Sequence, residues 1–180
     1  MSPTPPRIPF VPADIAEPAE VVAAIRARRG GELLTLDRML LHSPALAAGW
    51  NTFLGAVRES LVVDRRLREL AMCTVAVLNG AEYEYTQHAP LYIAAGASAA
   101  QARALRAPDA ARADAALFDA CERAAIGLVI EMTRHVAVAD DTFAAVRQHL
   151  GERETVELVA VVAAYNMVSR FLVATGIHPE

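Results

Sequence analysis

Residues 67–98 read LRELAMCTVAVLNGAEYEYTQHAPLYIAAGAS, and this stretch decides the fold. Two apolar segments with helical spacing lie on either side of Asn79 and Gly80. Asparagine and glycine tolerate the left-handed conformation that follows many helices, so the first helix is expected to end at this pair. A second helix is expected over residues 82–95, before Gly96. Because only a short turn separates them, we predict that the two helices pack as an antiparallel hairpin.

The rest of the chain carries the same helical signal. From Pro18 onward alanine, leucine, arginine and glutamate predominate, and no alternating pattern with hairpin turns indicates a strand. The sequence therefore predicts an all-α fold. Outside the hairpin, helices are expected over residues 18–29, 32–42, 44–60, 98–106, 108–135, 140–150 and 152–175.

Proline is concentrated at the N-terminal end, where six of the ten prolines fall within the first 18 residues. Proline fixes φ and lacks an amide hydrogen, which predicts an extended arm over residues 1–17. Its apolar side chains Ile8, Phe10 and Val11 favour an arm that lies on a surface, of this subunit or of a neighbouring one. Residues 18–180 are then expected to form a single domain.

Composition and charge exclude several classes of protein. The formal net charge is -4 and the arginines are scattered, so the basic footprint of a nucleic-acid-binding protein is missing. Hydrophobic residues make up 54% of the chain, yet no uncharged apolar run reaches the roughly 18 residues of a membrane span. The excess apolar surface is expected to contact other subunits. The N-terminal residues lack the apolar core of a secretory signal, so a cytoplasmic location is expected.

The cysteines and histidines do not form a metal-binding pattern. Cys73 and Cys121 are far apart in sequence, and no histidine pair has zinc-ligand spacing. We therefore expect neither a metal nor a dithiol centre within the chain.

The hairpin is expected to gather ionisable side chains in one place. Glu69 lies about ten residues before the turn and His88 about eight after it, which puts them at nearly the same height at roughly 1.5 Å rise per residue. Cys73 is one turn from Glu69, and Glu84 is one turn from His88. A buried carboxylate beside an imidazole can hold and deliver a proton. Tyr83 adds a candidate hydroxyl donor.

A structural role is the alternative for each of these residues. Paired ionisable groups are also common inside helical hairpins, where they satisfy each other by hydrogen bonding. Cys73 has the size and polarity of an ordinary core residue, and Tyr83 can serve packing alone. A cavity beside the Glu69 and His88 side chains would favour a catalytic site over this reading.

The stretch RLRELAMCTVAVLNGAEYEYTQHAPLYIAAGAS resembles the core motif of the carboxymuconolactone decarboxylase and alkylhydroperoxidase-D-like family. The flanking LLHSPALAAGWNTFL and the late ERETVELVAVVAAYNMVSRFLVATG are also similar, so the resemblance covers most of residues 32–176. It implies an all-α bundle built on a helical hairpin, which assembles into trimers or hexamers.

The resemblance also shows which branch of the family this chain departs from. In the peroxidase branch a glutamate precedes a CxxC pair and a histidine follows it. Here the glutamate corresponds to Glu69 and the histidine to His88, while Ala81 and Glu84 occupy the two cysteine positions. Without these thiols the dithiol mechanism is excluded. A peroxidase that uses Cys73 alone, or no cysteine, is kept as one alternative.

The decarboxylase branch implies a cofactor-free reaction on a small lactone or carboxylate. His88 is expected to be the proton donor or shuttle and Glu69 its orienting partner, with Glu84 as a second acid or base. Tyr83 and Cys73 are expected to contact the substrate. A ligand-binding oligomer without catalytic activity is the other alternative, because the fold alone does not fix the reaction.

Overall fold

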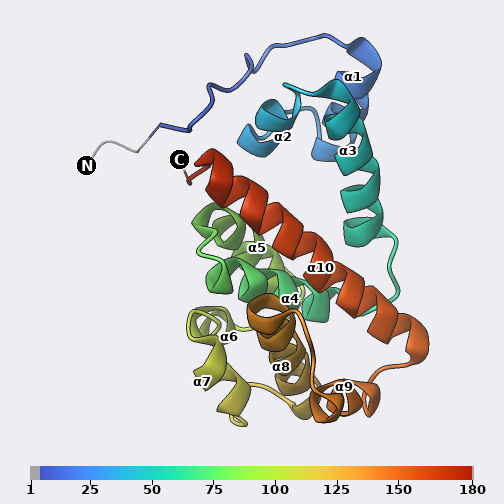
Figure 1. Cartoon of the computed structure of the whole chain (residues 1–180), viewed down its shortest axis with the longest axis vertical. Helices are drawn as coiled ribbons and strands as arrows, with labels where there is room; N and C mark the ends of the chain where they lie inside the picture. The colour runs from blue at the N-terminus through green and yellow to red at the C-terminus, as the bar shows by residue number, and fades with distance from the viewer. Residues whose placement is uncertain (1–4, 180) are drawn as a thin grey trace.

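The computed structural model describes residues 5–179, and within them all regular secondary structure is helical. The predicted all-α fold is confirmed. Figure 1 shows α1–α3 at one end of the molecule, α6–α9 at the other, and α4, α5 and α10 between them. The helices are α1 (Ala19–Arg29), α2 (Thr35–Leu40), α3 (Pro44–Glu59), α4 (Arg65–Leu78), α5 (Glu82–Ala94), α6 (Ala99–Ala104), α7 (Pro108–Ala113), α8 (Ala120–His135), α9 (Asp140–Arg147) and α10 (Glu152–Thr175).

The predicted hairpin is formed by α4 and α5. Asp64 starts α4 by accepting a hydrogen bond from the amide of Leu67 on its side chain. Gly80 adopts a φ of 67°, the left-handed conformation expected for the turn. Helix α4 packs against α5, α8 and α10 together. Buried side chains therefore surround α4 on all sides, and this helix is the centre of the core.

Helix α10 crosses the hairpin and contacts segments that are far apart in the sequence. It is long and apolar enough to span a membrane by length and composition, but half of its most apolar window is buried inside the protein. A core helix passes the same test, and α10 buries Leu158, Val161 and Tyr165. Near its start, the Glu157 carboxylate accepts hydrogen bonds from the amides of Val62 and Val63, which fixes the connection between α3 and α4.

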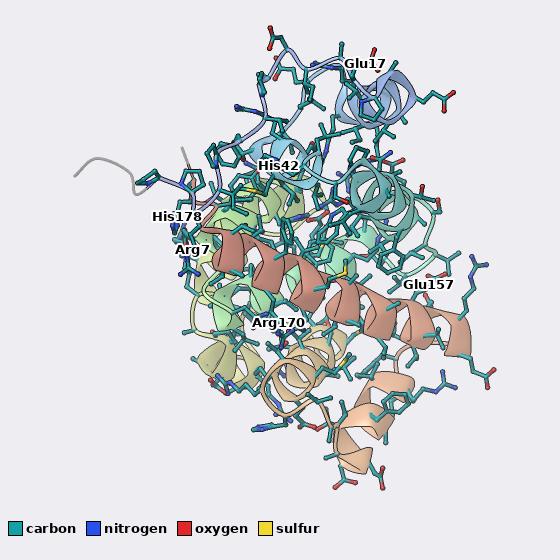
Figure 2. The ribbon with its side chains drawn as sticks, turned by 45° about the horizontal axis from the view of Figure 1, so that its top comes forward. Arg7, Glu17, His42, Glu157, Arg170 and His178 are labelled. Atoms are coloured by element: carbon teal, nitrogen blue, oxygen red, sulfur yellow. The ribbon has the colours of Figure 1, made fainter. Side chains whose placement is uncertain are left out.

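The described part of the proline-rich arm, residues 5–17, contains no helix. It packs against helices of the same chain. The amide of Arg7 donates to the carbonyl of Thr175, near the end of α10. Three carbonyls of the arm are bound by side chains of α1, of α2 and of the loop after α2: Arg26 donates to Ala13, Arg38 donates to Val11 and His42 contacts Pro9. Figure 2 labels Arg7 and His42 on this side of the molecule. The arm thus connects the α1–α3 layer to α10.

Two helix boundaries differ from the sequence-based prediction. The single helix expected over residues 108–135 is wrong: residues 114–119 leave the helix and separate α7 from α8. Asp114 accepts hydrogen bonds from the amides of Ala116 and Leu117, and Asp119 forms a capping box with Glu122. These local hydrogen bonds compete with helix continuation. The helix expected over residues 32–42 is shorter, because α2 spans only Thr35–Leu40.

Candidate active site

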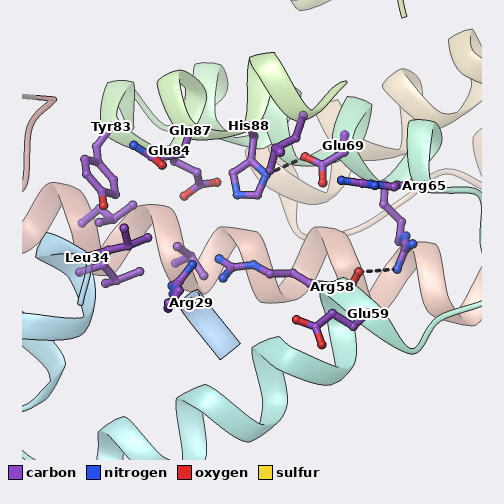
Figure 3. A pocket seen from close by; sticks show the side chains of 15 residues that line it. Arg29, Leu34, Arg58, Glu59, Arg65, Glu69, Tyr83, Glu84, Gln87 and His88 are labelled. Atoms are coloured by element: carbon purple, nitrogen blue, oxygen red, sulfur yellow. Dashed lines mark hydrogen bonds and ion pairs between the residues drawn. The ribbon is translucent and has the colours of Figure 1, made fainter. Parts of the chain in front are cut away.

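A cavity of about 490 Å³ lies between the α1–α2 segment and the helices α3, α4, α5 and α10. Figure 3 shows side chains from these elements converging on it. The residues that line it are Arg29, Leu34, Leu36, Arg58, Glu59, Arg65, Arg68, Glu69, Tyr83, Glu84, Gln87, His88, Leu91, Val168 and Leu172. Its walls therefore come from segments far apart in sequence, and a volume of this size suits a small organic molecule.

Glu69 and His88 contact each other at the cavity wall, as the register of the hairpin predicts. The Nδ1 atom of His88 lies 2.7 Å from Oε2 of Glu69, and both side chains are buried. Burial lowers the pKa of His88, and the neighbouring Glu69 opposes this shift only in part. His88 is therefore a neutral imidazole at pH 7. Because the Glu69 carboxylate accepts a hydrogen bond, Nδ1 carries the hydrogen and Nε2 is the basic nitrogen.

Glu84 also places a carboxyl group on the cavity wall. Unlike the carboxyl group of an exposed glutamate, this group is mostly protonated at pH 7. It is 2% exposed, and its two carboxyl oxygens lie 3.1 and 3.0 Å from the hydroxyl of Ser169 on α10. Burial raises the pKa of Glu84 to about 8, although Ser169 and Arg58 act in the other direction. At pH 7 the Glu84 carboxyl is therefore mostly protonated and able to donate a proton.

Four arginines line the same cavity, and sequence reasoning did not find the central one. The side chain of Arg58 runs below Glu84 and His88 in the view of Figure 3. Its Nε donates to the hydroxyl of Tyr165 at 2.7 Å, and Tyr165 in turn packs its ring edge-on against His88 at 4.9 Å. Arg58 follows Leu54 and Val57 on the buried face of α3. The sequence feature that could have pointed to Arg58 is a cationic residue on an otherwise apolar face of the helix.

The other arginines of the cavity have partners or lie at its edge. Arg29 pairs with Asp37, and Arg68 donates to the backbone carbonyls of Val57 and Arg58. Arg65 is exposed. The neighbouring Arg66 does not line the cavity and pairs with Glu122 on α8 at 2.6 Å.

The two remaining predicted site residues, Tyr83 and Cys73, differ in whether they reach the cavity. Tyr83 lines the cavity, while the hydroxyl of Tyr85 turns away and donates to the carbonyl of Ala102. Cys73, expected to contact the substrate, does not line the cavity and is 0% exposed. Burial raises the pKa of its thiol, and Glu69 and Glu84 add to the shift. Cys73 is a core residue because α4 is buried on all sides, including the side toward α8 and α10.

Within residues 5–179, no three histidine, cysteine, aspartate or glutamate side chains come together as metal ligands. The polar groups of the cavity wall are instead suited to proton transfer and to binding an anion.

Comparison with known proteins agrees with these features. The model of the carboxymuconolactone decarboxylase family matches residues 44–126. Over these residues, a little under half of the chain, the sequence is similar to this family. The match includes α3 with Arg58 and the whole hairpin that carries Glu69, Glu84 and His88. The family resemblance seen in the sequence is thus confirmed. No curated protein matches the chain.

Solved structures show the same fold at low sequence identity. An uncharacterized peroxidase-related protein from Silicibacter sp. TM1040 is 16% identical, with a TM-score of 0.83 over 100% of this chain and 95% of that one. An alkylhydroperoxidase AhpD core protein from Ralstonia eutropha JMP134, also peroxidase-related, is 16% identical, with a TM-score of 0.81 over 97% and 92%. The debrominase Bmp8, solved with 2,3,4-tribromopyrrole, is 14% identical, with a TM-score of 0.78 over 95% and 90%. At these identities the likeness establishes an alkylhydroperoxidase-D-like fold alone.

Proposed function

We propose that this protein is a carboxymuconolactone decarboxylase-like enzyme, which decarboxylates a small lactone or carboxylate, or moves a proton on it, without a cofactor. One observation carries the proposal. A protonated carboxyl group, Glu84, and a neutral histidine, His88, lie on the wall of the same cavity. Such a pair supplies an acid and a base at neutral pH, which is the requirement of acid-base catalysis.

In the proposed reaction the bond between the substrate carbon and its carboxylate breaks, and carbon dioxide leaves. The electron pair of that bond moves toward the lactone carbonyl, where an enolate oxygen develops. Glu84 then gives its proton to carbon, so that one proton is consumed for each carbon dioxide released. His88, held by Glu69, shuttles a replacement proton from solvent to Glu84 through Nε2. Tyr83 is the candidate hydroxyl donor to the substrate.

The charges of the wall support an anionic substrate. Four arginines (29, 58, 65 and 68) face three glutamates (59, 69 and 84), and protonation of Glu84 leaves four positive and two negative groups at pH 7. Glu82 does not change this balance, because it lies outside the cavity and forms a bidentate pair with Arg106. A positively charged, partly enclosed cavity attracts and orients a carboxylate.

The test is turnover of a γ-lactone that carries a carboxylate on its ring. Loss of ultraviolet absorbance, release of carbon dioxide and uptake of one proton would be followed together with the purified protein. We expect Glu84→Gln to reduce kcat by about 100-fold or more, since the amide has no proton to donate. His135→Ala, a change at an exposed histidine on α8, is the matched control and should keep full activity. Full activity of Glu84→Gln would refute the proposed proton donor.

The same assay separates the alternatives. The single-cysteine peroxidase has little support, because the Cys73 thiol is buried and its pKa is raised, which leaves it protonated and inaccessible. Peroxide turnover that disappears with Cys73→Ser would nevertheless establish it. A protein that binds carboxylates but turns over neither lactone nor peroxide would be the ligand-binding oligomer.

We also propose that the protein assembles as a trimer or hexamer in the cytoplasm. Large apolar side chains are exposed on α3 and α10, namely Leu46, Phe53, Val156, Met167 and Val173. Apolar surface of this kind favours contact with other subunits. Light scattering coupled to size-exclusion chromatography would give the number of subunits, and a monomeric mass would contradict the proposal.

A further inference from the structure

The two ends of the cavity differ in chemistry. Figure 3 places Leu34 and Tyr83 at one end, and Glu59 and Arg65 at the other, with Arg58 and His88 between them. The hydrogen bond from Ser169 to Glu84 brings one turn of α10 against the first turn of α5, beside Tyr83. This turn contributes two buried apolar side chains to the wall, Val168 and Leu172. One end of the cavity is therefore an apolar pocket, which we call the Leu34 end.

Arg58 has hydrogen-bonding capacity that the protein does not use. Within residues 5–179, only its Nε has a side-chain partner, the hydroxyl of Tyr165. Among the described residues, Arg58 forms no ion pair with a carboxylate. Its two terminal nitrogens are therefore available in the cavity, and they form the fork that binds a carboxylate with two hydrogen bonds.

The other cationic groups are less suited to a second carboxylate. The pairing of Arg29 with Asp37 and the backbone bonds of Arg68 already engage these two side chains. The carboxylate of Glu59 lines the cavity away from the Leu34 end, so a second anionic group there would meet a like charge. The cavity thus offers one well-formed carboxylate position.

We infer that the substrate is a small monocarboxylate with an apolar body, whose carboxylate binds Arg58 while the body occupies the Leu34 end. This inference rests on the proposed function for the reaction, and it adds the class and orientation of the substrate. In this orientation the carbon next to the carboxylate lies beside Glu84 and His88, where a proton must be delivered. Tyr165 is a positioning residue, because its hydroxyl fixes the side chain of Arg58.

Calorimetric titration of the full-length protein tests binding without requiring turnover. The probes are 3-phenylpropionate, which has one carboxylate and an apolar ring, acetate, which lacks the ring, and propane-1,2,3-tricarboxylate, which has three carboxylates. We expect 3-phenylpropionate to bind at least tenfold more tightly than either of the others, since only it uses both Arg58 and the Leu34 end. Equal or tighter binding of the tricarboxylate would overturn the inference.

Matched variants locate the two halves of the ligand. Arg58→Gln should weaken binding of 3-phenylpropionate at least tenfold, and Arg65→Gln, at the cavity edge, by less than threefold. Leu34→Asn should weaken it severalfold, while Val136→Asn, at an exposed position after α8, should have no effect. Arg58→Lys keeps the charge but loses the fork, and should bind with intermediate affinity. Stronger dependence on Arg65 than on Arg58 would refute the assigned orientation.

Failure of this inference can be told from failure of the proposed function. If 3-phenylpropionate binds through Arg58 but no lactone is decarboxylated, the binding mode stands and the proposed reaction fails. If a lactone is decarboxylated in a Glu84-dependent manner while Arg58→Gln leaves its KM unchanged, the reaction stands and the binding mode is overturned.

Discussion

Helix α4 contributes to two polar clusters one turn apart, and they differ in what lies beside them. Glu69 contacts His88 at 2.7 Å, and Arg66 contacts Glu122 at 2.6 Å. The first pair opens on the 490 Å³ cavity, whereas Arg66 and Glu122 do not line it. Close pairing is thus shared by both clusters, although the Arg66 side chain is 33% exposed. The adjoining cavity marks Glu69 and His88 as a candidate catalytic pair.

The second cluster also has a clear structural task. Glu122 is the third residue of α8 and completes the capping box with Asp119, so its carboxyl group holds the start of that helix. Around it, Arg66 Nε and Tyr92 Oη are buried and lack a hydrogen-bond partner among the described protein atoms. Buried groups left in this way reduce stability, so the cluster holds α4, α5 and α8 together at some energetic cost.

The largest expected effect is on catalysis by the first cluster. His88→Ala should lower kcat/KM for lactone decarboxylation by about 100- to 10,000-fold, because it removes the proton shuttle. Glu122→Gln, in the second cluster, should change kcat/KM by less than threefold. Steady-state kinetics of both variants measures the difference. Similar losses in the two variants would mean that the cavity does not distinguish the clusters.

The free energy of unfolding should depend more on the second cluster than on the first. Glu122→Ala removes both the partner of Arg66 and half of the capping box, and should lower the free energy of unfolding by about 2 to 4 kcal/mol. Glu69→Gln keeps a hydrogen-bond acceptor for His88 and should cost about 1 kcal/mol. Urea denaturation of both variants gives the two values. A larger loss for Glu69→Gln would assign the Glu69 and His88 pair to the framework of the protein.

A third test uses pH. The folded-state pKa of Glu84, about 8, is above its ordinary value of 4.5, so the folded protein binds a proton that the unfolded chain releases between these values. The contribution of Glu84 to stability is therefore complete at low pH and is lost as pH rises from about 4.5 to 8, by up to about 1.4 kcal/mol per pH unit. Urea denaturation of wild type and Glu84→Gln across this window should show a difference that shrinks or reverses as pH rises.

The same groups should shape the pH dependence of activity. Activity is expected to fall above about pH 8, as Glu84 loses its proton, and below the lowered pKa of His88, which lies under 6.5. Activity that continues to rise through pH 9 would contradict a protonated Glu84 as the donor.

The smallest effect is expected at Cys73. Cys73→Ala should leave kcat/KM within about threefold of wild type, because the thiol does not reach the cavity. It should lower the free energy of unfolding by about 1 kcal/mol, since a small core side chain is shortened. Loss of activity with unchanged stability would return Cys73 to the candidate site.

The parts of the site that sequence could predict are those that depend on local geometry. The turn at Asn79 and Gly80 and the rise of an α-helix are sufficient to place Glu69 opposite His88, and helical periodicity puts Glu84 one turn away. Arg58 was missed because α3 reaches the cavity only through tertiary packing, which no spacing within the hairpin encodes. The break at Asp114 was missed because alanines surround it and extend the helical pattern on both sides.

The N-terminal arm is held both through its backbone and through the side chains of Phe10, Val11 and Ile15, which pack against the core, and this affects which of its residues can change. His42, Arg38 and Arg26 bind the carbonyls of Pro9, Val11 and Ala13, which are alternate residues of an extended segment and so present their oxygens on one side. Every residue type supplies a carbonyl, and proline, which lacks only the amide hydrogen, serves equally well. Positions 9 and 13 should therefore tolerate sequence variation without displacing the arm, whereas the packed side chains of the arm and the arginines of α1 and α2 that hold it should not be replaceable.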